Sequence, residues 1–292
     1  MSHLTDEIAS QPECWAKAIE AAGSAGPSLP RPGERVAAIG CGSSLNVARC
    51  YAVLREAAGH GQTDAFPASE VPLTRRYDHM VFISRTGTTT EVLDALGQAR
   101  PGTRTTAVSA DPGSPLVRQA TATVLLDFSA ERSVVSSRFI TSAIVLLRAH
   151  LGADLRALPD QAARELARPL PPGLVGQTEF TFLGRGWAAP VADEAALKLR
   201  EASRTWAESY PALEYRHGPI SVSDTSTVVW ALGQVPSSLL ADARRTGATV
   251  IDPAGDPLTG LIGAQRLAAA LAQGKGIDPD QPRALSRSVI LA

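Results

Sequence analysis

Short apolar runs alternate with longer stretches of helical periodicity along most of the chain. The runs have the length and apolar content of buried strands, and several are followed by the Gly, Pro and Asp residues that signal turns. They lie at 35–39, 80–84, 105–109 and 123–126 in the first half and at 180–183, 228–232 and 248–252 in the second. Strands that alternate with helices are typical of parallel sheets with helices on both faces, so the pattern predicts an α/β fold.

Two of the runs continue in the same way. Each leads into a Gly-x-Gly turn, at 40–42 and at 184–186, and then into a helical stretch that we expect to end at Glu56 and at about Glu208. The two turns lie about 144 residues apart, which indicates a duplicated unit. The next two runs of the first half also have counterparts in the second half, whereas the run at 123–126 has none.

A cluster of four prolines separates the two halves and predicts a linker over 158–173. The first predicted domain therefore covers 1–157 and includes a helix over 7–22 that precedes the first sheet. The second covers 174–292 and ends in a tail with turn residues, followed by an apolar, strand-like run at 289–292.

Composition narrows the class of protein. The chain has 292 residues with 28 Lys and Arg against 29 Asp and Glu, a balance that does not indicate a nucleic-acid partner. No apolar run is long enough for a membrane span, and the polar, acidic N-terminus does not resemble a signal peptide. Cys14, Cys41 and Cys50 form no C-x-x-C pair, so we expect a reduced, cytoplasmic protein. No His, Cys and Asp cluster has metal-site spacing, and no cofactor is implied.

Three polar loops are expected at or near the carboxyl ends of strands in the first half, where ligands bind in open α/β sheets. In the loop at 40–44, glycines allow the backbone to approach a ligand, and the following helix offers N–H groups to an anion. Leu45 stands where a dinucleotide fingerprint has its third glycine, and the Lys of a P-loop is absent. A simple tight turn therefore stays open as an alternative.

The loop at 84–91 places five hydroxyl residues around Gly87, directly before a helical stretch. An ordinary helix cap needs one hydroxyl, so this loop favours a site for a phosphate monoester. The loop at 131–138 precedes an apolar helix, and there a plain helix start and a sugar contact both stay open. The corresponding second-half loop at 233–238 has no threonine cluster, so we expect the phosphate site in the first domain.

Acid–base candidates lie in the second half. Lys198 and Glu201 are three residues apart and would share one face of a helix, as a surface ion pair or as a functional pair. His217 lies in a Tyr-Arg-His-Gly-Pro segment whose Gly-Pro fixes a turn. A loop histidine flanked by charge can transfer protons, although it can also be purely structural.

Four segments together carry a resemblance to a known family. Residues 84–89 resemble its Ser-x-Ser-Gly-x-Thr loop, 197–201 its Leu-Lys-Leu-Lys-Glu helix, 215–219 its Lys-His-Gly-Pro loop and 278–285 its Asp-x-Asp-x-Pro-Arg-Asn-Leu tail. Their order and spacing agree along nearly the whole chain. The chain thus resembles the sugar isomerase (SIS) domain family, in particular the isomerase half of glucosamine-6-phosphate synthase. The resemblance implies tandem SIS lobes, each a flavodoxin-like three-layer α/β/α sandwich with a five-stranded parallel sheet.

The resemblance also implies roles for individual residues. Glu201 would move a proton between C1 and C2 of a hexose 6-phosphate, and His217 would help to open the sugar ring, often from the other subunit of a homodimer. The implied catalytic candidates are Glu201, His217, Lys198 and Arg287. The implied substrate-binding candidates are Cys41, Gly42, Ser43, Ser44, Ser84, Arg85, Thr86, Gly87, Thr89, Val134 and Ser136.

Two departures from the family pattern affect the chemistry. The chain starts Met-Ser-His without a nucleophilic cysteine, so we expect no glutaminase activity. Arg287 stands at the position of the family's Schiff-base lysine, and a guanidinium cannot act as that amine. Lys198 is then the remaining candidate amine, while Arg287 could pair with the phosphate or an open-chain oxygen.

Three interpretations stay open. One is a phosphosugar isomerase or aminosugar-phosphate deaminase, and another is a lyase or deglycase that acts on a sugar-phosphate adduct. The third is a non-catalytic phosphosugar-binding regulator. The presence of both Glu201 and His217 favours an enzyme, because a sensor needs neither.

Overall fold

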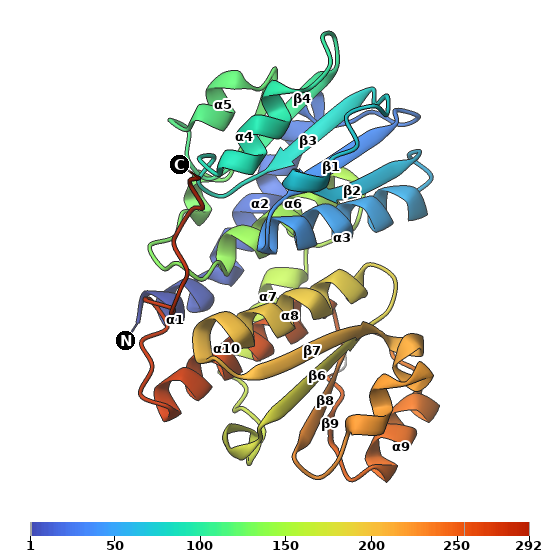
Figure 1. The fold of residues 1–292 in the computed structure, drawn as a ribbon, viewed down its shortest axis with the longest axis vertical. Coiled ribbons are helices and arrows are strands. Elements are labelled where there is room, and N and C mark those ends of the chain that lie inside the picture. Colours follow the sequence, from blue (N-terminus) through green and yellow to red (C-terminus); the bar gives the residue numbers. More distant parts are fainter. Residues whose placement is uncertain (1, 254, 292) are drawn as a thin grey trace. The chain divides into compact units, whose positions relative to one another are not determined.

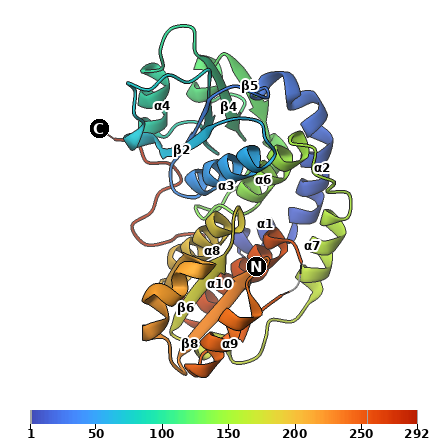
Figure 2. The same cartoon turned by 90° about the vertical axis from the view of Figure 1, so that its right-hand side faces the viewer.

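The computed structural model describes residues 2–253 and 255–291. These residues form two compact units, and each unit is built from several segments of the chain. The first-sheet unit consists of Ser10–Glu131, Ser136–Pro159 and Ser286–Ala292, and the second-sheet unit consists of Met1–Ala9, Arg132–Val135 and Asp160–Leu285. Figures 1 and 2 show the elements of both units.

Five parallel strands form the sheet of the first-sheet unit. They are β1 (Val36–Gly40), β2 (Thr63–Pro67), β3 (His79–Ile83), β4 (Arg104–Ser109) and β5 (Ala122–Leu125). Their order in the sheet is β2-β1-β3-β4-β5. This is the flavodoxin-like order, in which the chain extends the sheet in both directions from β1 and leaves a switch point between β1 and β3.

Helices cover both faces of this sheet (Figure 1). Right-handed crossovers place α3 (Ser43–Ala57), which leads to β2, and α4 (Thr90–Gly97), which leads to β4, on opposite faces. On the α3 side, α6 (Arg138–His150) packs between α3 and α2 (Gln11–Ala25). On the α4 side, alternate strand residues pack against α4 and α5 (Pro115–Gln119), with Ile39, Phe82, Val92 and Leu116 in one apolar cluster. Short 3-10 helices lie at Gly26–Ser28 (η1), Ala68–Glu70 (η2) and Asp127–Ser129 (η3).

The second-sheet unit repeats this plan on a smaller scale. Its parallel strands are β6 (Glu179–Gly184), β7 (Trp206–Pro211), β8 (Thr227–Leu232) and β9 (Thr249–Ile251), in the order β7-β6-β8-β9. Its helices are α1 (His3–Ala9), α7 (Leu158–Ala167), α8 (Ala188–Ser203), α9 (Ser237–Arg245) and α10 (Pro257–Gly274), with 3-10 helices at Leu174–Gly176 (η4), Ala212–His217 (η5) and Pro219–Val222 (η6). α8 packs on β6 and β7 and against α10, whereas Leu183 and Val229 pack with residues of η5 and α9.

The expectation of five strands in each sheet is wrong for the second sheet, which has four strands within residues 2–253 and 255–291. After β9 the chain enters α10, most of whose residues are buried, and no β5-like strand follows. The run at 289–292 was expected to be strand-like, but residues 289–291 join no sheet, and Ala292 lies outside the described residues.

Two strands were not foreseen, and both occupy the same place in the repeat. β2 and β7 each form the edge of a sheet beside its first strand, and both mix polar with apolar residues instead of forming an apolar run. The helix expected to reach Glu208 ends at Ser203, because Arg204 adopts a left-handed backbone with φ 51° and the chain then enters β7.

The helix expected over 7–22 is also interrupted. α1 ends at Ala9 and α2 begins at Gln11, with Pro12 in its first turn, where the missing N–H of proline costs nothing. Within α2, the buried Trp15 donates its indole N–H to Thr141 Oγ1 at 2.8 Å, which fastens α2 to α6.

The region between the halves is partly helical, since α7 occupies residues 158–167 of the expected linker. The domain boundaries at 157 and 173 stay a prediction. In the part of the chain that the structure describes, no helix combines the length and the apolar character needed to cross a bilayer.

A buried histidine gives the first-sheet unit a pH-dependent stability. His79 at the start of β3 is fully buried; its Nε2 lies 2.7 Å from Thr106 Oγ1, and its Nδ1 lies 3.5 Å from Glu34 Oε2. Burial, followed by the nearby Arg104, lowers the pKa of His79 from 6.5 to about 4. The unfolded chain therefore binds a proton more tightly than the folded one, and stability falls as pH drops from 6.5 towards 4.

We expect His79→Gln to flatten the pH dependence of stability in this window. As the pH falls from 6.5 to 4, the histidine lowers the free energy of unfolding by about 1.4 kcal/mol per pH unit, or about 3 kcal/mol in all. Glutamine does not titrate and has no such effect. Urea unfolding of both proteins between pH 4 and 8 measures the effect. The difference at pH 8, where His79 is neutral in both states, serves as the control for packing. If the free energy of unfolding depended on pH equally in the two proteins, the low pKa of the buried His79 would be contradicted.

Candidate active site

The loops after β1 and β3 lie at the switch point of the first sheet. The two strands pair directly, with Ile39 opposite Phe82, so the loops leave the same sheet edge as neighbours. Gly40 permits a tight start to α3, because a Cβ there would meet the backbone of Ser44 at 2.6 Å. Of the candidates in this loop, Gly42 has a left-handed φ of 54°, Ser43 is half-buried and Ser44 is buried.

Cys41 in the same loop is half-buried, and burial raises the pKa of its thiol. The raised pKa keeps the side chain in the neutral thiol form at neutral pH, so Cys41 is poorly suited to act as a nucleophile. It can contribute shape and a weak hydrogen bond to a ligand site.

Internal contacts give the loop after β3 a defined shape. Ser84 Oγ accepts a hydrogen bond from the backbone N–H of Gly87 at 3.1 Å, and Ser109 Oγ donates to the carbonyl of Arg85 at 3.2 Å. Gly87 has a φ of 59° and lies so close to Ser114 that a side chain would not fit. The loop therefore presents Thr86, Thr88 and Thr89 directly before the first turn of α4.

Residues of the C-terminal tail contact these hydroxyl groups. Thr88 Oγ1 donates to Ser288 Oγ at 2.9 Å, and Thr89 Oγ1 lies 3.3 Å from the same atom. At the start of α4, the backbone N–H of Thr90 donates to the carbonyl of Val289 at 3.1 Å. A phosphate group that used the same donors would take the place of these tail oxygens.

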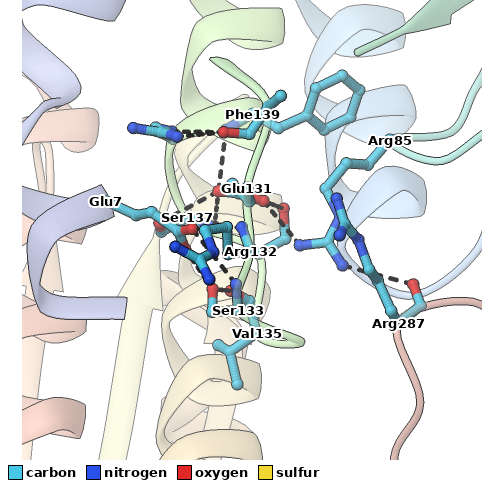
Figure 3. A network of polar contacts seen from close by, with 12 residues as sticks. Glu7, Arg85, Glu131, Arg132, Ser133, Val135, Ser137, Phe139 and Arg287 are labelled. Carbon is cyan, nitrogen blue, oxygen red and sulfur yellow. Dashed lines mark hydrogen bonds and ion pairs between the residues drawn. The ribbon is translucent and has the colours of Figure 1, made fainter. Parts of the chain in front are cut away.

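A buried ion pair connects this loop to the start of α6 (Figure 3). Arg85 Nη1 lies 2.7 Å from Glu131 Oε2, and the Glu131 side chain has no exposed surface. Ser136 Oγ donates to the same carboxylate at 2.8 Å, and the backbone N–H of Ser137 donates at 2.6 Å. Burial alone would raise the pKa of Glu131, but the Arg85 guanidinium and these hydrogen bonds outweigh it and lower the pKa.

A cavity of about 430 Å³ opens beside the ion pair, at the carboxyl ends of β3 and β4, and its volume is within the usual range for small-molecule sites. It is lined by Arg85, Thr86, Thr88, Ala110, Asp111, Pro112, Ala130 and Arg287. Arg287 is exposed, and its carbonyl accepts a hydrogen bond from Arg85 Nη2 at 3.4 Å. Two arginines and two threonines therefore line one space together with the acidic Asp111, so the basic residues outnumber the acidic one.

Val134 belongs to the second-sheet unit and is half-buried. Its neighbours are fixed by Glu7 of α1, whose carboxylate accepts hydrogen bonds from the backbone N–H groups of Arg132 at 2.5 Å and Ser133 at 3.3 Å, as well as from the Ser133 hydroxyl (Figure 3). Ser133 Oγ also lies 2.7 Å from the carbonyl of Val135. The backbone on both sides of Val134 is thereby held in place.

α8 carries a buried lysine between two glutamates. Lys198 Nζ lies 2.6 Å from Glu201 Oε2 and 3.2 Å from Glu194 Oε1, and only 2% of the lysine side chain is exposed. Burial opposes the charged form, but the two carboxylates outweigh it and raise the pKa of Lys198. Lys198 is therefore an ammonium at neutral pH and is not a nucleophilic amine, whereas Glu201, 20% exposed, is the accessible carboxylate.

His217 is the last residue of η5 and is exposed. The residues before it are anchored, because Tyr215 is buried and Arg216 Nε lies 2.6 Å from Asp242 Oδ2 of α9. Gly218, with a φ of 133°, follows directly and redirects the chain into η6. The imidazole is thus presented from a fixed turn.

The structure brings the predicted site residues together in two groups. In the first-sheet unit, the loop after β3, Ser136 and Arg287 are connected through Arg85 and its contacts. In the second-sheet unit, Lys198 and Glu201 are in contact. Glu131 and Glu194 were not among the residues predicted from the sequence. The spacing of Glu194, four residues before Lys198, was an available signal, whereas nothing in the sequence indicates the burial of Glu131.

Within residues 2–253 and 255–291, no group of three or more His, Cys, Asp or Glu side chains could hold a metal ion.

Comparison with known proteins finds similar sequences and similar folds. No family model matches it. Glutamine–fructose-6-phosphate aminotransferase (isomerizing) of Thermus thermophilus is 30% identical, over 89% of this chain and 52% of the relative, so the chain spans about half the length of such relatives. Glucosamine-6-phosphate deaminase from Thermotoga maritima has a TM-score of 0.82 at 26% identity, covering 99% of this chain and 100% of that one.

The C-terminal domain of glucosamine-fructose-6-phosphate aminotransferase from Francisella tularensis has the same fold, with a TM-score of 0.78 at 23% identity over 97% of this chain and 98% of that chain. Fold, motif order and these likenesses define a sugar-isomerase type of α/β protein. The chain is similar to glutamine–fructose-6-phosphate aminotransferase over about half of that relative, and it shares its fold with glucosamine-6-phosphate deaminase. These likenesses confirm the resemblance to sugar isomerase (SIS) proteins seen in the sequence motifs.

We expect Lys198→Met to lower the free energy of unfolding by about 3–5 kcal/mol, because it leaves the carboxylates of Glu194 and Glu201 without their shared cation. Lys17→Met is the matched control, since Lys17 and Glu13 form an exposed helical pair and its removal should leave stability nearly unchanged. Urea unfolding at pH 7 measures both. Equal effects of the two substitutions would show that the buried cluster does not depend on its lysine.

Proposed function

We propose that the chain binds a hexose or aminohexose 6-phosphate and acts as a phosphosugar isomerase or aminosugar-phosphate deaminase. The observation that carries the proposal is the hydroxyl-rich loop at 84–89, which internal hydrogen bonds hold at the switch point of a parallel sheet. The names of the relatives support it, because one is an isomerizing fructose-6-phosphate aminotransferase and another a glucosamine-6-phosphate deaminase.

We also propose that the two sheets are tandem SIS lobes. The strand order β7-β6-β8-β9 repeats the first four positions of β2-β1-β3-β4-β5, which supports a duplicated lobe that ends one strand earlier in the second half. The cytoplasmic location and the absence of a cofactor stay predictions.

In this proposal the phosphate is a handle that positions the reacting carbons. The hydroxyls of Ser84, Thr86 and Thr89 and the first-turn N–H groups of α4 bind it, with Ser43 and Ser44 nearby. Cys41, Gly42 and Gly87 allow close backbone approach, and Val134 and Ser136 contact the sugar. Arg85 and Arg287 supply positive charge, and Arg287 pairs with the phosphate or an open-chain oxygen.

Proton transfer then follows ring opening. His217 moves a proton between the ring oxygen and the C1 hydroxyl, which yields the open-chain aldose. Glu201 takes the proton from C2 and returns it to C1, so that an enediol-like intermediate forms and collapses to the ketose. With an amino group at C2, the same transfer gives a C2 imine, to which water adds with release of ammonia and the ketose.

Lys198 supports this role of Glu201 in the proposal. Its ammonium donates to the Glu201 carboxylate at 2.6 Å, which fixes the orientation of the base. Glu194 is the second carboxylate that contacts the ammonium group of Lys198. No amine nucleophile is required for proton transfer between neighbouring carbons, so the arginine at 287 is compatible with this chemistry.

The same residues fit a non-catalytic phosphosugar-binding regulator as the second candidate. The observation in its favour is Arg287, which stands at the position of the family's lysine and cannot form a Schiff base. A deglycase or lyase that used Glu201 as its base is the third candidate. Product analysis separates the three.

We expect Glu201→Gln to lower kcat by roughly 10²–10⁴-fold, because the amide cannot accept the C2 proton, while the Kd for the sugar phosphate changes little. Proton NMR of fructose, glucose and glucosamine 6-phosphates follows turnover, and calorimetry follows binding. Glu13→Gln, a change at an exposed glutamate of α2, is the control. Unchanged turnover would exclude Glu201 as the base, and tight binding by a wild-type chain without turnover would favour the regulator.

We propose a homodimer whose active sites are shared through His217, and mixed dimers test this. Glu201→Gln and His217→Asn should each be inactive, while subunit exchange between them should restore about a quarter of wild-type activity, since half of the dimers are mixed and each has one intact site. Light scattering should give twice the chain mass of 30.5 kDa. A fully active monomer, or no recovery on mixing, would refute a shared site.

A further inference from the structure

We propose that Glu131 is a positioning residue for the sugar-phosphate site, an inference that rests on the proposed function. Its carboxylate holds together two segments that are far apart in sequence, the loop after β3 and the start of α6. One candidate ligand contact of each segment hydrogen-bonds to the carboxylate, Arg85 from the first and Ser136 from the second. Figure 3 shows Glu131 beside Arg85 and Ser137.

The two oxygens of Glu131 have different partners. Oε2 accepts from Arg85 Nη1 at 2.7 Å and from Ser136 Oγ at 2.8 Å. Oε1 accepts from the backbone N–H groups of Ser137 at 2.6 Å and Phe139 at 3.2 Å, and from Ser137 Oγ at 3.2 Å. One oxygen therefore fixes the start of α6, and the other fixes the two candidate contacts.

Burial makes this arrangement rigid. Glu131 has no exposed side-chain surface, and only 8% of the Arg85 side chain is exposed. A buried ion pair gives little net stability compared with an apolar pair of the same size, so its presence is better explained by orientation than by stability. The guanidinium that Glu131 holds also lines the cavity of about 430 Å³, together with Thr86 and Thr88.

Glu131→Gln separates the role of Oε1 at the start of α6 from the role of Oε2 at Arg85. Its amide oxygen can still accept from the backbone N–H groups of Ser137 and Phe139, so the start of α6 is retained. Its amide N–H₂ faces the Arg85 guanidinium, which offers only donors, and their hydrogen bond is lost. Glu131→Gln is thus expected to release Arg85, while the Ser136 hydroxyl can switch from donor to acceptor and the helix stays formed.

A double-mutant cycle on the full chain tests the proposal, with fructose 6-phosphate as the probe in calorimetry. We expect Glu131→Gln and Arg85→Gln each to weaken binding about tenfold, and the double variant to bind within about threefold of Arg85→Gln, because Glu131 acts through Arg85. A second cycle with Ser136→Ala should show weaker coupling, because the Ser136 hydroxyl can accept from the new amide whereas Arg85 cannot. A merely structural residue would lower the melting temperature without this specific coupling.

Glu7→Gln is the matched control, because Glu7 is also a buried carboxylate that accepts from backbone N–H groups and a serine hydroxyl. Its effect on binding should simply add to that of Arg85→Gln. If Glu131→Gln does not fold because Arg85 loses its carboxylate partner, the double variant removes both charges, and its comparison with Arg85→Gln alone still tests the coupling.

Wild-type affinity in Glu131→Gln, tighter binding, or full additivity with Arg85→Gln would overturn the positioning role and leave the proposed function intact. A wild-type chain that binds no fructose 6-phosphate or other hexose 6-phosphate would instead overturn the proposed function, and this inference with it.

Discussion

The parallel pairing of β1 with both β2 and β3 is the constraint on which the candidate site depends. Because all strands of the first sheet run in one direction, the loops after β1, β3 and β4 leave from one edge. The helices that follow β1 and β3 cover opposite faces, so the loops before them diverge and leave room between them. The hydroxyl groups of the loop at 84–89 gather at this edge, while His79 begins β3 at the opposite one.

Buried charge is balanced in two different ways in the two units. Around Glu131 both carboxylate oxygens have several donors, and the result is a closed, rigid network. Around Lys198 one cation serves two carboxylates, of which Glu201 keeps a fifth of its surface exposed. The first arrangement suits orientation of neighbouring groups, and the second leaves one carboxylate accessible to solvent.

Sequence patterns predicted the elements whose burial is uniform and missed those whose environment is mixed. The central strands β1, β3, β6 and β8 form apolar runs because both faces are covered, and the runs were visible. The edge strands β2 and β7 carry polar residues on a partly solvated side, so their periodicity was weak. The missing fifth strand of the second sheet was signalled by the run at 123–126, which had no counterpart, although the family resemblance suggested otherwise.

The candidate site was predictable where local sequence carries the chemistry. The loop at 84–89 was recognisable from its hydroxyl residues, and the Lys198–Glu201 pair from its helical spacing. Glu131 contacts Arg85 across 46 positions, and Arg287 contacts Arg85 across 202 positions. Contacts at such separations depend on the tertiary fold, which local patterns do not encode.

The contacts between the tail and the loop after β3 have a thermodynamic consequence. The Thr88 hydroxyl and the N–H of Thr90 already have acceptors within the same chain, in Ser288 and Val289. An anion that uses these donors competes with an internal ligand whose effective concentration is fixed by the chain itself. The apparent affinity of the anion therefore equals its intrinsic affinity multiplied by the fraction of molecules in which the tail has left these donors. Dilution of the protein does not change that fraction.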